Sequence, residues 1–487
     1  MSMIVDAHYR EVELPEYRGH PLISALPPIA PDDVVYPHFS TEWSSSEQER
    51  AAPAHIRKKM LKRIKQFLYS LPEYIDIFRS IEDAIITGYL PKNPSTPTGQ
   101  HFLHYIERDA TSTQPVTGIF CPTGTALSLF GESGAGKTRG VERSLDWYPQ
   151  VISHDSFLGR PLNLRQVVWL RVDCPPSASI WGFVTEIIDQ LDKALGTNEL
   201  ERGVAKPRNI HEAGVFIQRK LRSLWVGILV LDELQNLEVG ASDLRKQFLN
   251  LLLHIINSAG VPILFCGNQE SKALLQTTLR NARRAEDGGS TELGAIDPVI
   301  WPDFVKKLWQ IQYTSVHTPL DDDLSARLFL LSKGLPAFAV NIYSAAQALV
   351  IGSHEEVISC ETLDEGYLAA CSLSANALEN VPLPSTENDT KESPAPKAGA
   401  DDPDVAPPLS PTTEQNPAPI ADIDRVQHSE FSSQTLNTRR NNFRVPLGVD
   451  TDILRSAGNA TDPYLYLIEN KQVVVDLFAG DSLMRRG

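Results

Sequence analysis

Cysteine is scarce in this sequence, and no two cysteines are spaced to share a metal. The 487 residues include five cysteines, an odd number, and none of them belongs to a C-x-x-C motif. These features argue against a disulfide framework and against a zinc knuckle. We therefore expect the chain to work in the reducing cytoplasm of a cell.

Long apolar runs and a leader-like N-terminus are also missing. The first residues, MSMIVDAHYREVELPEY, contain neither a basic n-region nor an apolar h-region. No run reaches the roughly 18 apolar residues that a membrane span requires, and no internal repeat is visible. The sequence thus predicts a soluble, cytoplasmic protein that does not associate with membranes.

Negative charge prevails, but it is unevenly distributed. The formal net charge of −16 would by itself disfavour nucleic acid as a partner. Acidic residues concentrate in the Pro-rich stretch near residues 385–430. A basic cluster lies instead in the stretch HIRKKMLKRIKQFL and comprises Arg57, Lys58, Lys59, Lys62, Arg63 and Lys65.

The basic cluster is expected on one face of a helix near residues 55–68. Apolar residues recur at helical spacing on the opposite face, at Met60, Leu61, Ile64, Phe67 and Leu68. Two interpretations stay open with equal weight: a solvated face over a core, or contacts with nucleic-acid phosphates. Under the second interpretation, the DNA-binding candidates are Lys58, Lys59, Lys62, Arg63 and Lys65.

Apolar runs alternate with helical periodicity over residues 115–318. Four runs predict buried parallel strands, and KLWQIQYT (307–314) is a candidate for a fifth. The four are ALSLF (126–130), QVVWLRVDC (166–174), VGILVLDE (226–233) and VPILFCGN (261–268). Strands that alternate with helices predict an α/β fold, with a parallel five-stranded sheet inside a three-layer α/β/α core.

The remaining segments are predicted to flank this core. Residues 1–114 form an N-terminal extension that contains the basic cluster, and residues 319–380 are helical by pattern and predict a small lid. Residues 381–435 have the composition of a disordered, Pro-rich acidic linker. Residues 436–487 regain apolar residues and predict a small C-terminal element or a docking peptide.

The strongest chemical signal is FGESGAGKTRG at 130–140, which satisfies G-x-x-x-x-G-K-[ST] between a predicted strand and a predicted helix. Glycines let backbone N–H groups curl around phosphate oxygens, and the helix adds its N-terminal dipole. Lys137 is predicted to reach the β and γ phosphates, and Thr138 to ligate magnesium. A G-x-S-x-G nucleophile elbow is excluded because Ala135 stands at its last glycine position. The nucleotide-binding candidates are Gly131, Glu132, Ser133, Gly134, Ala135, Gly136, Lys137, Thr138 and Arg139.

Asp232 and Glu233 end the apolar run ILVL, at the sheet edge where the phosphate-binding loop is expected. Asp232 is predicted to hold magnesium through water. Glu233 is predicted to orient and deprotonate the water that attacks the γ phosphate.

Two further candidates follow the next strand. Asn268 either contacts the γ phosphate or the attacking water, or simply forms a turn. One of Arg280, Arg283 and Arg284, in the stretch TLRNARRA, is predicted to act as an arginine finger in a neighbouring subunit's site. The alternative is that these arginines meet DNA phosphates or solvent.

The order of these motifs, followed by a helical lid, is the layout of AAA+ ATPases. Up to about residue 370 the chain also resembles the TnsC/TniB family of transposition regulators, most closely TnsC. The segments that carry this resemblance are YRGHPLISALPPI (17–29), ITGYLPKNP (86–94), VVWLRVDCPPSASIWGF (167–183), DQLDKALGTN (189–198), LRNARRA (279–285) and LWQIQY (308–313).

The resemblance implies a regulatory ATPase of a bacterial transposon that uses ATP and Mg²⁺, and the absence of an arginine from the lid segment SKGLPAFAVN predicts slow hydrolysis. Such proteins form rings or filaments around double-stranded DNA and link a target-selector protein to the transposase and its associated endonuclease. The positions that match the family are Lys137, Thr138, Asp232, Glu233 and Asn268 in the nucleotide site, and Arg280, Arg283 and Arg284 in the arginine-rich helix. One departure is the lid segment SKGLPAFAVN, which lacks the arginine that many AAA+ lids use to sense nucleotide.

Two other functions stay open. A generic AAA+ or STAND-type ATPase of signalling or replication would share the core without a transposase partner. A DNA-bound adaptor that holds ATP without splitting it would be a binding module rather than an enzyme.

Overall fold

The computed structural model describes residues 4–12, 14–97, 99–100, 124–204, 207–276 and 288–383, together with two short strands near the C-terminus. The chain divides into two compact units, Met1–Glu392 and Ser393–Gly487. In the second unit the described residues form the antiparallel pair β9 (Val474–Val475) and β10 (Leu483–Met484). The linker predicted at 381–435 lies outside the described residues, apart from its first three.

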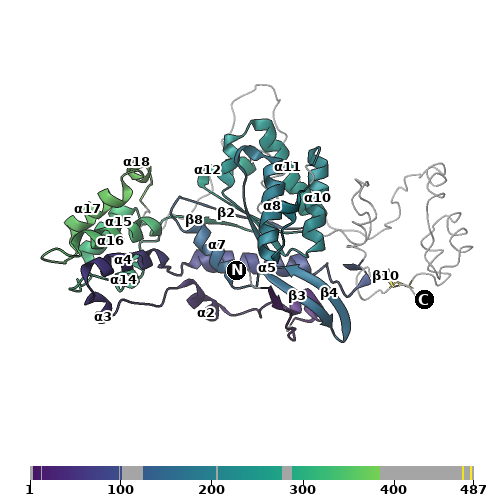
Figure 1. The fold of residues 1–487 in the computed structure, drawn as a ribbon, viewed down its shortest axis with the longest axis horizontal. Helices are drawn as coiled ribbons and strands as arrows, with labels where there is room; N and C mark the ends of the chain where they lie inside the picture. Colours follow the sequence, from purple (N-terminus) through teal and green to yellow (C-terminus); the bar gives the residue numbers. More distant parts are fainter. Residues whose placement is uncertain are drawn as a thin grey trace, which may run out of the picture. The chain divides into compact units, whose positions relative to one another are not determined.

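A parallel five-stranded sheet forms the centre of the first unit (Figure 1). Its strands stand in the order β5-β6-β7-β2-β8, and every neighbouring pair is parallel. Four predicted strands are confirmed; three of the apolar runs are buried on both faces of the sheet, whereas the run at 169–173 forms a partly buried edge strand. Their bounds are β2 (Ala126–Gly131), β5 (Trp169–Asp173), β6 (Ile228–Asp232) and β7 (Ile263–Gly267).

The prediction of a fifth strand at 307–314 is wrong. The fifth strand is β8 (Ser290–Leu293), whereas residues 307–309 end the helix α14 (Trp301–Trp309). β8 is a short edge strand with little apolar character, so it gave no apolar run. Trp301, Phe304, Val305 and Leu308 recur at helical spacing and are buried, which favours the helix.

Helices cover both faces of the sheet and complete the three layers. Successive residues of β6 point into different cores: Val230 packs with side chains of α5 (Pro72–Tyr89) and α7 (Lys137–Asp146), whereas Leu229 and Leu231 pack with those of the opposite layer. That opposite layer consists of α8 (Ile180–Leu195), α10 (Ile210–Ser223) and α11 (Ser242–Ala259). The short elements at its ends are η4 (Pro176–Ala178), α9 (Glu199–Arg202), η5 (Leu234–Val239) and α12 (Gln269–Gln276).

A second, three-stranded sheet was not predicted from the sequence. β3 (Val151–Phe157) and β4 (Arg160–Val167) form an antiparallel hairpin, and β1 (Ile4–Asp6) pairs parallel with β3. Leu158 and Gly159 make the two-residue turn, both with positive φ (48° and 76°). Two positive φ values are the geometry that matches a turn to the twist of a tight hairpin.

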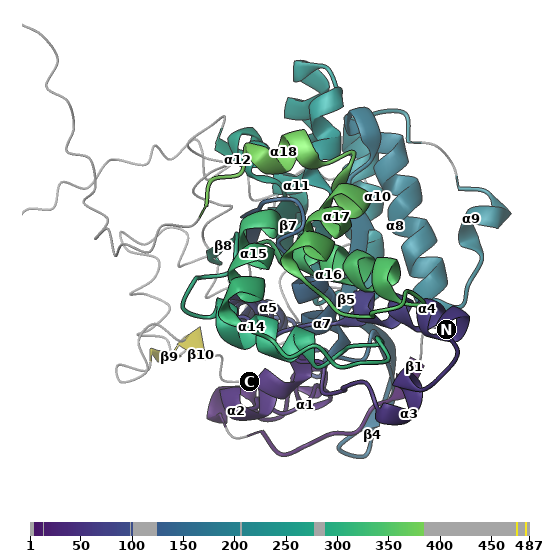
Figure 2. The same ribbon diagram turned by 90° about the vertical axis from the view of Figure 1, so that its left-hand side faces the viewer.

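The C-terminal part of the first unit is helical and is called the lid here. Besides α14 it comprises α15 (Asp322–Ser332), α16 (Pro336–Val350), α17 (Cys360–Cys371) and α18 (Ala375–Glu379), which face the viewer in Figure 2. None of the described helices is both long and apolar enough to cross a membrane.

The N-terminal region contains short helices before the long α5. They are η1 (Pro15–Tyr17), α1 (Pro21–Ser24), α2 (Asp32–Val35), η2 (Tyr36–Phe39), α3 (Glu47–Arg50), α4 (Ala54–Met60) and η3 (Leu61–Gln66). The helix predicted near 55–68 is present over residues 54–66, but its α-helical part ends at Met60 and a 3₁₀ helix follows. Leu61, Ile64 and Phe67 recur every third residue, and three residues per turn place all three on the buried side. Residues 54–66 are called the basic segment below.

Candidate nucleotide-binding site

The phosphate-binding loop joins β2 to α7 in the conformation that glycine permits. Gly134 and Gly136 have φ values of 87° and 99°, in the left-handed region. A Cβ atom on Gly131 would come within 1.9 Å of the Leu293 carbonyl oxygen, so β8 leaves room for glycine alone at this position. The helix α7 begins at Lys137, directly after this loop.

Lys137 spans the loop that it follows. Its ammonium group donates hydrogen bonds to the carbonyl oxygens of Gly131 (2.8 Å) and Glu132 (2.9 Å). Burial lowers the pKa of Lys137, because the charged form loses contact with water. A phosphate group at the loop would give this half-buried cation an anionic partner in place of two neutral carbonyls.

Asp232 lies at the end of β6, beside the first turn of α7. One carboxylate oxygen, Oδ2, is 3.5 Å from the Thr138 hydroxyl and accepts a hydrogen bond from Arg171 Nη2 (2.8 Å). Arg171 Nη1 reaches Glu142 Oε1 at 2.8 Å. The structure thus brings Thr138 and Asp232 together and adds a cation, Arg171, which the sequence reasoning missed. The available signal was an arginine inside the otherwise apolar run VVWLRVD, since a charged side chain that is partly buried needs a partner.

Glu233 follows Asp232 in a backbone conformation that is unusual for a residue with a side chain. Its φ and ψ are 57° and 42°, and the left-handed region costs a non-glycine residue about 1–2 kcal/mol. Its N–H donates to Asp232 Oδ1 (2.9 Å), and its carboxylate accepts a hydrogen bond from the Gln235 side chain. Strain of this kind clusters at functional sites.

The two residues expected to hold magnesium fit that ion. The Thr138 hydroxyl and the Asp232 carboxylate are hard oxygen donors at one point of the sheet edge. Among the described residues, no group of three or more His, Cys, Asp or Glu side chains could hold a metal. Magnesium here would therefore need phosphate oxygens and water as its other ligands, which is how this ion commonly binds beside nucleotides.

Asn268 follows β7 and caps the next helix. Its Oδ1 accepts hydrogen bonds from the Ser271 N–H (2.9 Å) and hydroxyl (2.5 Å), and its Nδ2 donates to Glu270 (3.3 Å). These contacts fit the turn-forming interpretation; a role toward the γ phosphate stays a prediction. The predicted finger candidates, Arg280, Arg283 and Arg284, lie outside the described residues.

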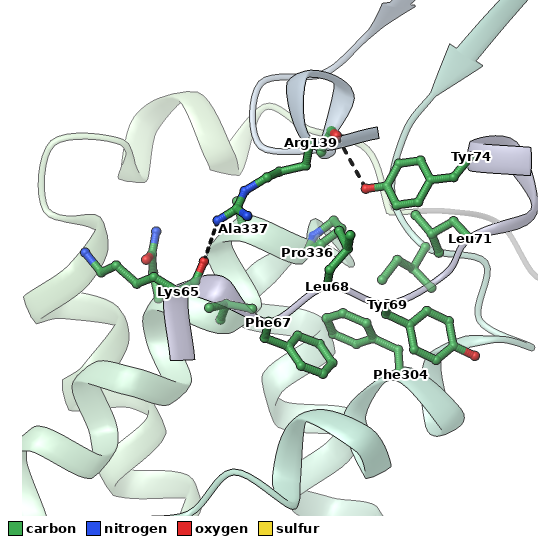
Figure 3. Close-up of a pocket in the computed structure, with 14 residues that line it drawn as sticks. Lys65, Phe67, Leu68, Tyr69, Leu71, Tyr74, Arg139, Phe304, Pro336 and Ala337 are labelled. Carbon is green, nitrogen blue, oxygen red and sulfur yellow. Dashed lines mark hydrogen bonds between the residues drawn. The ribbon is translucent and has the colours of Figure 1, made fainter. Parts of the chain in front are cut away.

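An apolar pocket of about 210 Å³ adjoins the phosphate-binding loop, and the sequence reasoning missed it. Segments that are far apart in the chain line it: residues 65–74, Gly136 and Arg139 at the start of α7, Ile296 and Phe304, and the start of α16. Figure 3 shows Phe67, Tyr69 and Phe304 gathered on one side of the pocket and Arg139 reaching Lys65. An apolar cavity beside the phosphate-binding loop has the character of a site for a nucleotide base.

The lid touches the phosphate-binding loop directly. The Ala337 N–H donates to the Gly134 carbonyl oxygen (3.1 Å), and the Phe338 ring covers the Cα of Gly134. The lid segment SKGLPAFAVN, which has no arginine, thus contacts the loop through a backbone amide and an aromatic ring.

The basic segment presents its cations to solvent, with one exception. Lys58, Lys59, Lys62, Arg63 and Lys65 are exposed, and Arg63 pairs with Glu49 at 2.6 Å. Arg57, in contrast, is buried and pairs with Glu356 of the lid. The exposed lysines and Arg63 have the accessibility that contacts with phosphates require.

Comparisons with known proteins agree with the fold. Residues 123–275 match the family model described as an AAA domain, and this range contains the phosphate-binding loop, Asp232, Glu233 and Asn268. The five-stranded parallel sheet with helices on both faces is the α/β fold of AAA+ P-loop NTPases. No curated protein matches the sequence.

Several solved structures are similar at low identity. A Walker-type ATPase of Pyrococcus abyssi has 14% identity and a TM-score of 0.34, over 52% of this chain and 69% of that one. Cdc6p from Pyrobaculum aerophilum has 13% identity and a TM-score of 0.38, over 62% and 68%. The ORC1 protein of Aeropyrum pernix, solved in complex with DNA, has 16% identity and a TM-score of 0.32, over 59% and 68%.

Proposed function

We propose that this chain is an ATP-hydrolysing switch that assembles on duplex DNA and regulates transposition, as its resemblance to the TnsC/TniB family implies. The observation that carries the ATPase part is the meeting of Lys137, Thr138 and Asp232 at one sheet edge, with Glu233 next in the chain. The transposition part rests on the quoted sequence segments.

In the proposed reaction, the loop N–H groups and Lys137 hold the phosphates of ATP, and the apolar pocket holds the base. Magnesium, held by Thr138 and through water by Asp232, would balance the charge on the β and γ phosphates. Glu233 takes a proton from a water molecule as the water oxygen bonds to the γ phosphorus. The bond from this phosphorus to the bridging oxygen breaks, and ADP and phosphate leave.

DNA enters this scheme through thermodynamic linkage. If ATP favours the assembled, DNA-bound state, DNA raises the affinity for ATP by the same factor. A ring or filament of identical chains would contact the DNA backbone without sequence preference and with strong salt dependence. The proposed partners are a target-selector protein and the transposase with its endonuclease, and one of Arg280, Arg283 and Arg284 would complete a neighbour's site.

Two alternatives make different predictions. A generic AAA+ or STAND-type ATPase would not co-purify with a transposase encoded beside it. An adaptor that only holds ATP would release no phosphate in the presence of DNA.

The decisive experiment is electron microscopy of the protein on duplex DNA, with and without a non-hydrolysable ATP analogue. We expect rings or filaments only with the analogue, and none for Lys137→Ala, which loses the phosphate-binding cation. Glu233→Gln with ATP should give complexes that outlast those of the wild type, because the base is gone but binding is kept. Monomers under every condition would refute the assembly proposal, and complexes of Glu233→Gln that dissolve as fast as wild type would refute the role of Glu233.

A further inference from the structure

The N-terminal region divides its contacts between the sheet and the lid. The α5 helix belongs to the sheet side, where the Tyr89 hydroxyl donates to the Trp225 carbonyl at 2.9 Å. Residues 45–66 belong to the lid side: the Ser45 N–H donates to the Gln310 carbonyl at 3.1 Å, and η3 packs against α16. One sequence region therefore contacts both the sheet and the lid.

Arg57 joins the basic segment to the lid through a buried salt bridge and hydrogen bonds. Its guanidinium pairs in a bidentate manner with Glu356 and also donates to the Tyr313 carbonyl at 2.9 Å. Glu356 accepts further hydrogen bonds from the N–H groups of Ser315 (2.7 Å) and Gly352 (2.8 Å). Both side chains are buried, at 6% and 7% exposure. A bidentate pair with this many additional hydrogen bonds fixes the basic segment in one orientation on the lid.

The other cations of the basic segment are exposed to solvent and take no part in the Arg57–Glu356 pair. In the described part of the chain, no ion pair involves Lys58, Lys59, Lys62 or Lys65, all of which are exposed. The lid therefore carries an exposed cationic surface on an element that the buried Arg57–Glu356 pair attaches to it.

Two contacts near the pocket join the lid and the basic segment to the phosphate-binding loop. Arg139, the residue after Thr138, donates from Nη2 to the Lys65 carbonyl at 2.8 Å (Figure 3). The second is the Ala337 N–H to Gly134 contact described above. The pocket lies between these contacts, so a base and its phosphates would touch both the lid side and the sheet side.

We propose that the lid and residues 45–66 move as one body, and that nucleotide held between this body and the phosphate-binding loop sets the position of the cationic surface toward the DNA backbone. Arg139 is the positioning residue that joins the two. The inference rests on the proposed function, because it assigns the regulation of the same nucleotide site. A ligand that contacts both bodies shifts the equilibrium between an open and a closed arrangement. The size of this shift is set by the difference in the ligand's affinity for the two arrangements.

Distances between spin labels on the full chain test the mechanical part. Labels at Lys62→Cys and Leu349→Cys report within the proposed body, and labels at Lys62→Cys and Asp146→Cys report between it and the α7 side, with reactive native cysteines replaced by serine. Leu349 is 46% exposed, and Lys62 and Asp146 are exposed. We expect the ATP analogue with magnesium to shift the second distance and not the first. An unchanged second distance in protein that binds the analogue, or a shift in the first, would overturn the inference.

DNA binding separates this inference from the proposed function. Arg139→Met should reduce the ratio of DNA affinities with and without the analogue toward one, at an analogue concentration that a fluorescent-nucleotide titration shows to saturate the variant. Arg143→Met, one turn further along α7, is the matched control and should keep the wild-type ratio. If wild-type protein binds DNA equally with and without analogue, the proposed function is wrong. If wild type shows the dependence and Arg139→Met keeps it, Arg139 is not the link.

Discussion

Replacing Glu356 by glutamine should loosen the basic segment from the lid. The substitution keeps the shape of the side chain but only one acceptor oxygen, whereas the Ser315 N–H donates to Oε2 and the Gly352 N–H to Oε1, so one of the two N–H groups loses its partner. It removes the negative charge and leaves Arg57 as a buried cation without a counterion. We expect a large loss of stability, because an uncompensated buried charge costs far more than a missing surface pair.

The magnitude follows from the pKa of the carboxyl group. Hydrogen bonds from Arg57 lower the pKa of Glu356 from 4.5 to about 2, although burial acts in the opposite direction. At about 1.4 kcal/mol per pKa unit, the shift corresponds to about 3 kcal/mol of folding free energy at neutral pH. The cost of breaking one side of a buried pair, about 3–5 kcal/mol, agrees with this value.

The sign of the pH dependence is fixed by the direction of the shift. Because the pKa is lower in the folded state, this contribution is complete above pH 4.5 and is lost as the pH falls toward 2. The stability difference between wild type and Glu356→Gln should therefore be largest at neutral pH and shrink progressively below pH 4.5.

Urea unfolding followed by circular dichroism, at neutral pH and at pH 3.5, measures this difference. Glu355→Gln is the matched control, since Glu355 is the exposed neighbour, and it should change stability by less than about 0.5 kcal/mol. Equal destabilisation by the two substitutions would refute the reasoning. So would a difference between wild type and Glu356→Gln that stays the same at pH 3.5.

Two further predictions concern the nucleotide site. Gly134→Ala should abolish nucleotide binding in a fluorescent-nucleotide titration, because a φ of 87° is strained for alanine and the new Cβ would lie 2.9 Å from the Phe338 ring. Gly159→Ala is the control and should keep wild-type binding, because Gly159 has a similar φ of 76° but no atom near the new Cβ. Val340→Phe, which narrows the pocket, should weaken nucleotide binding at least tenfold, or about 1.4 kcal/mol. Val350→Phe, at a buried position of the same helix away from the pocket, should weaken it far less in calorimetry, and equal losses would count against the pocket as the base site.

The sequence predicted the sheet well where strands are long and apolar. The runs at β2, β6 and β7 are buried on both faces, so composition alone marks them. It failed at β8, a short strand with the polar sequence STEL, because an edge strand does not need an apolar run. The mistaken strand at 307–314 combines the end of a helix with buried residues that make no sheet contacts.

The candidate site likewise has one part that could be predicted from the sequence and one part that could not. Short sequence motifs identify four candidate residues, because the spacing within each motif follows from its chemistry. These residues are Lys137, Thr138, Asp232 and Glu233. The pocket could not be predicted, because its walls come from residues 65–74, Gly136 and Arg139, Ile296 and Phe304, and residues 336–341, which only the tertiary fold brings together. Contacts between segments so far apart in the chain produce no periodic pattern in the sequence of either segment.

The pairing of Arg57 with Glu356 also has a consequence for synthesis of the chain. The two residues are 299 positions apart, and at about 5–20 residues per second a ribosome needs roughly 15–60 s to travel that distance. During this interval Leu61 and Ile64, both buried in the finished fold, have no lid to pack against. The nascent chain therefore presents a basic, partly apolar segment for tens of seconds, the kind of surface that chaperones bind.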